Sequence, residues 1–343
     1  MLSERAGSIL NILVEEYINS AVPVASEEIA RRSLTKVSPA TVRNTMSLLT
    51  DEGYISRPHV SSGAIPSDLG YRHYVQSLDE PPELPVTVQQ KIHRDFSQAE
   101  PDLEAWSRQC ATLLSDLTAS LAVVTVPWAR SPRLKHIQLV FLEEFLALLV
   151  VVLQETRLLR RLLPVAQPIT QEILDQSANR LNDLLCDLDY DDIKSKNLSN
   201  NPELTPLEAR VRHETTLMLK DASGDTAPEH YVDGLRRLLD QPEFAQSGRA
   251  KALVEMLEER VLLENLLPQM PESREVAVYI GEENQEASLH PYGVILCQYR
   301  GANQSTGTIC VIGPTRMGYP AAIGGVTFFS SLMSKLVGEL HRV

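Results

Sequence analysis

The stretch SPATVRNTMSLLTDEGYI, residues 38–55, decides the fold of the first part of this chain. Ser38 is a natural helix N-cap, because its hydroxyl can accept a hydrogen bond from a free backbone N–H of the first turn. Pro39 follows at the first helical position, where its fixed φ suits a helix and its missing N–H is not needed. Gly53 suits the position just past a helix end. The sequence therefore predicts a helix that begins after Ser38 and ends at Gly53.

One side of this predicted helix is apolar, and the opposite side is small, polar and cationic. The apolar positions Val42, Met46 and Leu49 recur at helical spacing and are predicted to face the core. The residues left on the outward side are Ala40, Arg43, Asn44 and Ser47. Asn can form two hydrogen bonds with adenine and Arg two with guanine, so Asn44 and Arg43 are the foremost candidates for reading bases. A solvated face in a protein-interaction module would show the same pattern.

Two helices are predicted before this stretch and a hairpin after it. Apolar residues recur at helical spacing over 4–18, and residues 26–32 form a second helix with Ser26 as its N-cap. Between 54 and 66, extended residues flank a Ser-Ser-Gly turn, which predicts a wing of two short strands. This order is that of the winged-helix domain, whose third helix enters the major groove of DNA. The predicted domain covers residues 1–78.

The predicted wing adds a cation and small donors that suit phosphate contacts, which position a protein on DNA without reading its sequence. For His59, which follows Pro58, a role in stabilising the hairpin turn fits equally well. The predicted DNA-contacting residues are Ser38, Ala40, Thr41, Arg43, Asn44, Ser47, Arg57, His59, Ser61 and Ser62.

The charge of the chain is unevenly distributed. The formal net charge of the 343 residues is −13, which at first sight disfavours a nucleic-acid partner. Residues 31–57 differ from the rest, because they hold five cations and two anions. A modestly basic reading head on an acidic body would resist non-specific DNA binding and so favour discrimination over raw affinity.

The residue patterns argue against catalysis and against bound cofactors. His213-Glu214 lacks the second histidine of a zinc-protease helix, and the chain has neither a Gly-rich phosphate loop nor a G-x-S-x-G elbow. The four cysteines are far apart without a C-x-x-C pair, so reduced and mostly buried thiols are predicted. We predict that the protein is not an enzyme and needs no cofactor or metal.

The chain also lacks the patterns of secretion and of membrane insertion. It does not begin with the basic segment and apolar run of a secretion signal. The longest apolar run, residues 145–153, is far shorter than the roughly 20 residues that a membrane helix needs. A cytoplasmic protein without a membrane partner is predicted.

The remainder is predicted as two sets of strands on either side of a helical block. Connecting helices in 79–120 lead to apolar strands over 121–153, the last two of which are joined by a hairpin at Glu143-Glu144. Residues 169–267 are mostly helical, strands return within 276–312, and a helix covers about 319–340. One α+β domain interrupted by an inserted domain explains this order, and so do three domains in series. We favour the insertion.

The segment Gly313-Pro314-Thr315-Arg316 lies between the last predicted strand and the last predicted helix. Such a place suits an anion-binding helix N-terminus. A turn with Arg316 in an internal ion pair is the favoured interpretation.

These residues resemble the heat-inducible transcription repressor family HrcA. At the N-terminal end the resemblance rests on PVAS (23–26), SPATVRNTM (38–46), GYI (53–55), PHVSSG (58–63) and GYR (70–72). At the far end, YIGEEN (279–284) and VIGPTRMGY (311–319) resemble signatures of the same family. Two separated sets of motifs in the right order are more specific than either set alone.

The resemblance implies an α+β fold with an N-terminal winged helix-turn-helix, then a GAF-like α/β domain interrupted by a mostly helical inserted dimerising domain. The GAF-like domain would comprise 121–189 and 268–343, and the inserted domain 190–267. The resemblance further implies a homodimer that represses heat-shock chaperone operons of the groE and dnaK type. It would bind an inverted-repeat operator in double-stranded DNA, called CIRCE, and be modulated by a GroEL-type chaperonin.

The chain departs from the family pattern at three alanines. The family usually has glycine where Ala21 and Ala25 stand, and a basic wing residue where Ala64 stands. Ala64 weakens the case for a wing-to-DNA contact at that position. A ligand-responsive winged-helix regulator, whose GAF-like domain senses a small molecule, is the alternative function.

Overall fold

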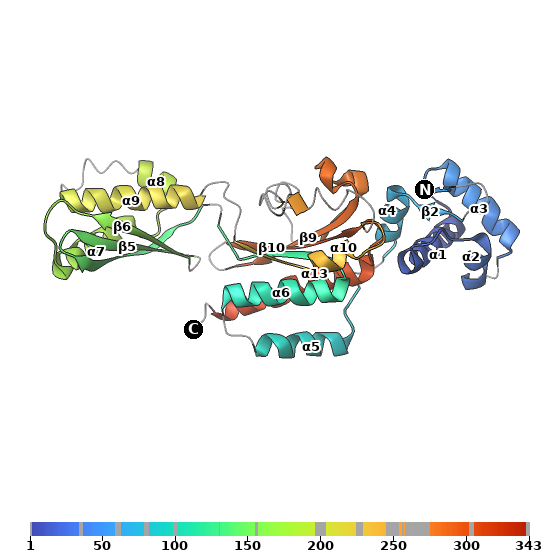
Figure 1. The fold of residues 1–343 in the computed structure, drawn as a ribbon, viewed down its shortest axis with the longest axis horizontal. Helices are drawn as coiled ribbons and strands as arrows, with labels where there is room; N and C mark the ends of the chain where they lie inside the picture. Colours follow the sequence, from blue (N-terminus) through green and yellow to red (C-terminus); the bar gives the residue numbers. More distant parts are fainter. Residues whose placement is uncertain are drawn as a thin grey trace. The chain divides into compact units, whose positions relative to one another are not determined.

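The computed structural model divides the chain into two compact units (Figure 1). Unit 1 contains Met1–Val126, Glu229–Tyr299 and Thr308–Lys335, and unit 2 contains Pro127–Pro228, Arg300–Gly307 and Leu336–Val343. The structure describes residues 2–33, 37–58, 63–78, 82–98, 102–129, 131–154, 157–195, 204–223, 229–244, 254–255, 257, 262, 266, 275–301 and 305–340.

Residues 2–78, which we call the head, form the start of unit 1. Their elements are α1 (Glu4–Ser20), α2 (Ser26–Arg32), α3 (Pro39–Asp51), β1 (Ile55–Ser56), β2 (Ile65–Pro66) and α4 (Asp68–Gln76). Strands β1 and β2 pair antiparallel. Apolar side chains from the first three helices fill the core of the head, among them Ile9, Leu10, Leu13, Ile29, Val42 and Leu49.

The third helix, α3, begins and ends as its sequence predicts. Ser38 Oγ accepts a hydrogen bond from the N–H of Thr41 at 3.2 Å. Gly53 has φ 81°, a left-handed conformation that glycine adopts without strain. In this conformation the N–H of Tyr54 donates to Leu49 O at 2.9 Å, which closes the last turn.

Two local predictions for the head are wrong. Ala25, not Ser26, is the N-cap of α2, and Ser26 is the first helical residue with its hydroxyl directed to other partners. Ala64 is not on the DNA-facing surface of the wing, where the family pattern would put a basic residue, because it is fully buried and exchanges two backbone hydrogen bonds of 2.9 Å with Val24. The neighbouring Gly63 lies so close to Pro23 that an added Cβ would be 2.5 Å from its carbonyl oxygen. The chain at 63–64 is therefore part of the core of the head.

The backbone conformation at the end of α1 explains why the family usually has glycine at position 21. Ala21 caps this helix at φ 54° and ψ 22°, in the left-handed region, and its N–H donates to Tyr17 O. An L-residue with a Cβ is strained there, whereas glycine is not. Ala25 has an ordinary extended conformation, with φ −82° and ψ 151°.

Ala21→Gly is therefore expected to stabilise the protein against unfolding by about 1 kcal/mol, because it removes left-handed strain that exceeds the added chain entropy of glycine. Ala25→Gly is the matched control, and it should destabilise slightly because only the entropy changes. Urea unfolding followed by circular dichroism measures both. Equal effects of the two substitutions would contradict the assigned strain.

A five-stranded sheet forms the middle of unit 1, in the order β7-β3-β10-β9-β8. Its strands are β3 (Leu121–Thr125), β7 (His230–Asp233), β8 (Ala277–Ile280), β9 (Tyr292–Arg300) and β10 (Thr306–Pro314). β3 pairs antiparallel with both β10 and β7. The chain thus leaves this sheet after β3 and returns at β7, a strand that the sequence analysis assigned to the helical block.

Helices α5 (Val86–Ser97) and α6 (Leu103–Thr118) also belong to unit 1, as does α13 (Tyr319–Leu340) up to Lys335 (Figure 1). α5 packs on α13 through the rings of Phe96 and Phe329, whose centroids are 6.1 Å apart. Within the described residues, α13 is the one helix long and apolar enough to cross a membrane by length and composition, and 50% of that stretch is buried inside the structure.

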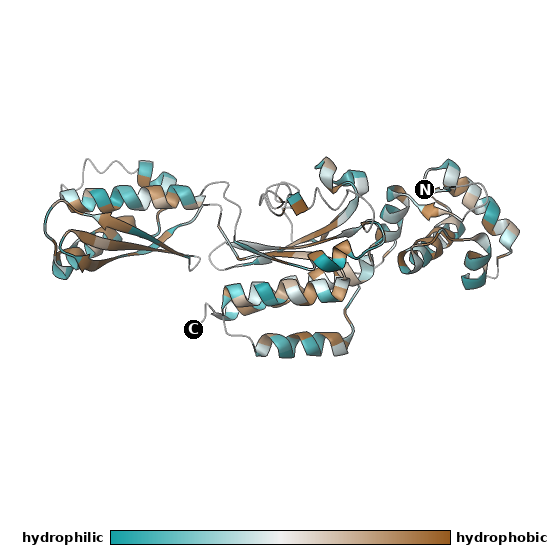
Figure 2. Cartoon of the chain, viewed as in Figure 1, coloured by the Kyte–Doolittle hydropathy of each residue, from teal (hydrophilic) through white to brown (hydrophobic). Residues whose placement is uncertain are grey.

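Unit 2 contains a second sheet, of order β4-β5-β6, with helices packed on it. The elements are β4 (Leu134–Glu143), β5 (Leu146–Leu153), β6 (Leu158–Pro164), α7 (Gln171–Leu185), α8 (Tyr190–Ser195) and α9 (Pro206–Ser223). Figure 2 shows how strongly the hydrophobic residues concentrate on these strands. The predicted hairpin at Glu143-Glu144 is present between β4 and β5.

The division between the units differs from the predicted domain boundaries. Residues 134–164 pair among themselves and not with β3, so they do not continue the sheet that was predicted to be GAF-like. The predicted inserted domain, 190–267, is split, because α8 and α9 pack in unit 2 whereas β7 joins the sheet of unit 1. Unit 2 is a mixed sheet-and-helix unit inserted mainly at 127–228.

Candidate nucleic-acid interface

The outward side of α3 is held by a rigid core on its other side. Val42 and Leu49 are fully buried and Met46 is 3% exposed, which confirms the predicted core face. Ala40, Arg43, Asn44 and Ser47 are exposed, as predicted, whereas Thr41 is half-buried. A helix fixed in this way can present side chains to a groove of DNA without further ordering of its backbone.

The small polar residues of α3 differ in how far they are already engaged. Ser38 serves as the N-cap, and its Oγ lies 3.0 Å from Thr41 Oγ1. Ser47 Oγ donates to Arg43 O at 3.1 Å within the helix. In the described part of the chain Asn44 is exposed and makes no hydrogen bond through its side chain, so both its donor and acceptor are available to a base edge.

Arg43 is connected to α2 in a way that the sequence analysis did not predict. Its Nη2 donates to Glu27 Oε1 at 2.6 Å and its Nε donates to Ser26 Oγ at 3.2 Å. Ser26 Oγ in turn donates to Glu27 Oε2 at 3.2 Å. The hydrogen bond from Arg43 holds the pKa of the Glu27 carboxyl below its usual value, so the pair is charged at neutral pH. Residues 16 and 17 positions apart carry no periodic signal, which is why the network was missed.

Leu48 is a second residue that the sequence analysis missed. It is 61% exposed on α3, one turn after Asn44, although large apolar side chains are usually buried in helices of this kind. Its spacing from Asn44 was a usable signal, because residues four apart lie on the same side of a helix. Apolar side chains in the major groove contact thymine methyl groups, so Leu48 extends the candidate reading surface.

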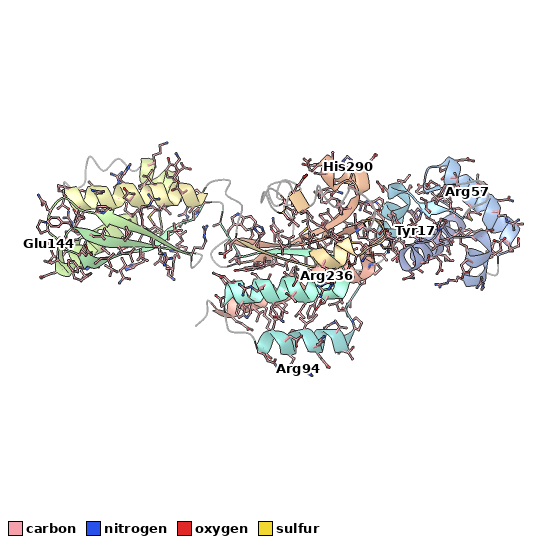
Figure 3. The ribbon with its side chains drawn as sticks, viewed as in Figure 1. Tyr17, Arg57, Arg94, Glu144, Arg236 and His290 are labelled. Carbon is pink, nitrogen blue, oxygen red and sulfur yellow. The ribbon has the colours of Figure 1, made fainter. Side chains whose placement is uncertain are left out.

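The predicted basic character of the head is partly neutralised within the head itself. Arg31 pairs with Glu28 at 2.7 Å, and Arg32 pairs with Glu16. Arg57 is exposed just after β1, at the position labelled in Figure 3. His59, Ser61 and Ser62, and the cation Lys36, lie outside the described residues.

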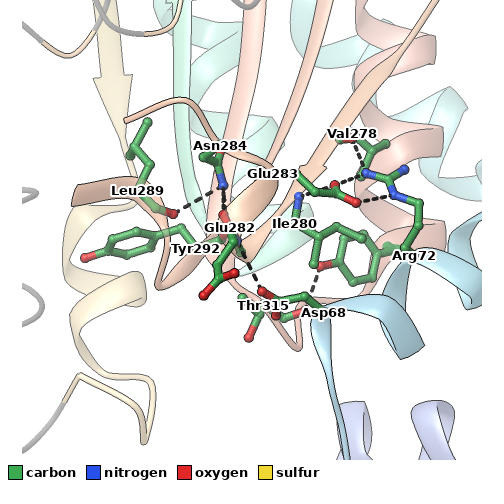
Figure 4. A network of polar contacts seen from close by, with 12 residues as sticks. Asp68, Arg72, Val278, Ile280, Glu282, Glu283, Asn284, Leu289, Tyr292 and Thr315 are labelled. Carbon is green, nitrogen blue, oxygen red and sulfur yellow. Dashed lines mark hydrogen bonds and ion pairs between the residues drawn. The ribbon is translucent and has the colours of Figure 1, made fainter. Parts of the chain in front are cut away.

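A polar network joins the head to the sheet of unit 1 (Figure 4). Arg72 of α4 donates to Val278 O at 2.6 Å and forms an ion pair with Glu283. Asp68, at the start of α4, accepts the N–H of Glu282 at 3.2 Å. The two glutamates belong to the family signature YIGEEN, which therefore contacts the head.

Arg316, in the other C-terminal signature, lies in an internal ion pair, which confirms the favoured interpretation of that segment. It pairs with Glu243, and its Nη2 donates to Gln241 Oε1 at 2.8 Å. Its Nη1 also donates to Ile18 O at 3.3 Å, near the end of α1. All the contacts found for this guanidinium are structural, and they connect the end of α1 in the head to the rest of unit 1.

Within the described ranges, no group of three or more His, Cys, Asp or Glu side chains could hold a metal ion. Cys110, Cys297 and Cys310 are buried and Cys186 is exposed, in agreement with the prediction that most of the cysteines are buried. A cavity of about 470 Å³ lies in unit 2, between α7 and the start of α9. It is lined by Val165, Ala166, Pro168, Ile169, Ile173 and Leu207 together with polar residues that include Arg180 and Glu208.

Comparison with known proteins gives consistent results. The family model for the HrcA protein C terminal domain matches residues 104–323. A heat-inducible transcription repressor HrcA from Dehalococcoides mccartyi is 38% identical over 99% of this chain and 97% of its own length. The repressor of the same name from Thermomicrobium roseum is 37% identical over 99% of this chain and 96% of its own length. A crystal structure of a hypothetical protein has the same fold, with a TM-score of 0.61, 20% identity and 99% of both chains covered.

The class of protein is therefore that of the transcription repressors, and the exposed side of α3 is its candidate DNA-reading surface. The chain belongs to the HrcA family of heat-inducible transcription repressors.

Proposed function

We propose that the head is a winged helix that reads an inverted-repeat operator of the CIRCE type, from which the protein represses chaperone operons. The observation that carries this proposal is the exposed polar side of α3, backed by a fully buried apolar side. Side chains on such a helix can reach base edges in the major groove, which is wide enough to admit a helix. The hairpin β1–β2 follows α3 in the chain, in the order of a winged helix, and as a wing it would contact the adjacent DNA backbone.

The same proposal includes a homodimer, because one reading head contacts few base pairs and a two-fold protein matches a two-fold operator. Unit 2 offers a surface for this contact. The sheet β4-β5-β6 buries Ala147, Leu149 and Val151 of β5 against its helices, and the alternate residues face the other way. Those alternate positions and their register partners form what we call the open face: Val140, Leu148, Val150, Val152, Leu158 and Leu162, together with the polar residues His136, Gln138 and Arg160.

The open face is largely apolar yet accessible. Leu158 and Leu162 are 68% and 58% exposed, the four other apolar residues are half-buried, and the three polar residues are exposed. Apolar patches of this kind on soluble proteins usually mark interaction sites. We assign the dimer contact to this face in place of the predicted block 190–267, whose residues are divided between the two units.

The remaining parts of the proposal follow the family. The sheet of unit 1 would be the GAF-like domain, the protein would act in the cytoplasm without a cofactor or catalytic activity, and a GroEL-type chaperonin would modulate it. Ligand sensing by the GAF-like domain is the second candidate, and the cavity of about 470 Å³ described above lies in unit 2, outside the five-stranded sheet.

Asn44→Ala tests the reading surface directly. The full-length protein first selects its preferred duplex from a random pool, and the variant is then titrated against that duplex at fixed salt. The variant should lose about 1–3 kcal/mol of binding free energy, which is the typical contribution of one bidentate hydrogen-bonded contact to a base. It should also discriminate less between bases at one base pair. Thermal unfolding should be unchanged, because Asn44 is exposed.

Asn19→Ala is the matched control for this experiment. It makes the same substitution at an exposed position of the same head, on α1, away from the proposed reading surface. It should leave operator affinity unchanged. Selection of no preferred sequence by the wild-type protein would refute the proposed function, and full affinity of Asn44→Ala would refute the assignment of α3 as the reading helix.

A further inference from the structure

The guanidinium of Arg43 is held along one edge. Its Nε and one hydrogen of Nη2 are engaged by Ser26 Oγ at 3.2 Å and by Glu27 Oε1 at 2.6 Å. A guanidinium is planar and carries five N–H donors in a fixed fork. The edge formed by Nη1 and the second hydrogen of Nη2 is therefore left over, and the two N–H groups on that edge are parallel.

Parallel N–H groups match the O6 and N7 acceptors of guanine in the major groove, a contact that requires the guanidinium plane to be correctly oriented. We propose that Glu27, together with Ser26, is a positioning residue that orients Arg43 so that its free edge reads a guanine of the operator. This inference rests on the proposed function, because it assumes that α3 enters the major groove.

The exposure of the ion pair between Arg43 and Glu27 indicates that this pair orients the Arg43 side chain and does little to stabilise the fold. The Arg43 and Glu27 side chains are 62% and 57% exposed. Ion pairs that are this exposed contribute little to folding. Holding a long side chain in its bound rotamer before binding increases affinity, because the conformational entropy of that side chain is then not lost when the base contact forms.

The charge of Glu27 has a second consequence. A carboxylate at the start of α2, beside the reading helix, repels DNA phosphates and so weakens binding to any sequence. It also occupies Arg43 and competes with a phosphate for the guanidinium. The contact thus lowers affinity for random DNA while it favours the one site where a guanine is correctly placed.

The test uses the full-length protein and a duplex that the wild type selects from a random pool. Each guanine is replaced in turn by 7-deazaguanine, which pairs normally but lacks the N7 acceptor. Wild type should lose about 5-fold or more in affinity at one guanine of each half-site, within the range of a two-bonded base contact. Arg43→Ala should show no loss at that guanine. Glu27→Ala should show a clearly smaller loss there than wild type, and it should bind random duplex more tightly than wild type.

Glu28→Ala is the matched control, because it removes the same charge from the next residue of α2. Glu28 pairs with Arg31 at 2.7 Å and not with Arg43. This variant should also gain affinity for random duplex, yet keep the full loss at the 7-deazaguanine position. A merely electrostatic role of Glu27 would make the two variants behave alike.

The inference is overturned if Glu27→Ala keeps the wild-type loss, if Glu28→Ala shows the same reduction, or if Arg43→Ala weakens all duplexes equally, as a phosphate contact would. In each of these outcomes the wild type still selects a sequence, so the proposed function stands. A wild type that selects none refutes the proposed function and this inference together.

Discussion

A monomer with an intact head is the expected result of replacing Leu158 and Leu162 together by Asp. The two side chains stand on the open face and are 68% and 58% exposed, so two carboxylates there cost the isolated chain little stability. In a dimer that buries this face, the same carboxylates would be desolvated without partners, which is strongly unfavourable. Sedimentation equilibrium of the full-length variant should show a single chain.

Loss of the dimer should weaken operator binding about 10²–10⁴-fold, because the second head no longer binds at the high effective concentration set by the first. Binding of a single half-site should be unchanged, since the head is untouched. Titration of full operator and half-site duplexes at one salt concentration separates the two effects.

Val86→Asp is the matched control, because Val86 in unit 1 is 67% exposed, close to the value for Leu158. This control should remain dimeric with wild-type affinity. A double variant that stays dimeric and keeps full operator affinity would place the dimer contact outside the open face.

Unfolding of the head is the expected result of Ala64→Arg. Ala64 is fully buried, and both of its backbone polar groups are bonded to Val24. An arginine there would either bury an unpaired charge or push the hairpin off the core, at a cost of about 3 kcal/mol or more. Operator affinity should fall with the loss of folded head, instead of rising as it would for a cation added at a wing tip.

Ser56→Arg is the control for Ala64→Arg, because it places the same charge on an exposed residue of the same hairpin. This variant should unfold like wild type. Urea unfolding followed by circular dichroism measures both proteins. An Ala64→Arg variant as stable as wild type would mean that residue 64 is not in the core.

The sequence alone determined the features that depend on neighbours a few residues away. The caps and apolar period of α3 and the hairpin at Glu143-Glu144 all follow from local backbone chemistry. The exposed side of α3 follows as well, because a helix with one buried side must present the other to solvent. The family motifs in the sequence are sufficient to identify the repressor family.

Only the tertiary structure decided which strands share a sheet. β6 was missed because Arg160 and Arg161 interrupt its apolar pattern, yet Arg161 is satisfied by Glu214 of α9 at 2.8 Å. β7 was hidden in a helical block because its pairing partner, β3, is about a hundred residues away in the chain. Strand pairing depends on such distant partners, so the unit boundaries could not be read from local patterns.

The tertiary structure also decided the environment of single residues. Ala64 belongs to a wing by its position in the sequence but is buried because it pairs with Val24, forty residues earlier. Gly281 is required because a Cβ there would lie 1.7 Å from Asp68 Oδ2 of the head. Arg43 is exposed because its position in α3 lies opposite the apolar side of the helix, whereas the orientation of its side chain comes from Glu27 on another helix. The spacing of apolar residues along a helix determines which side of the helix faces outward. The direction in which a side chain on that side points depends on the residues of other elements that folding brings next to it.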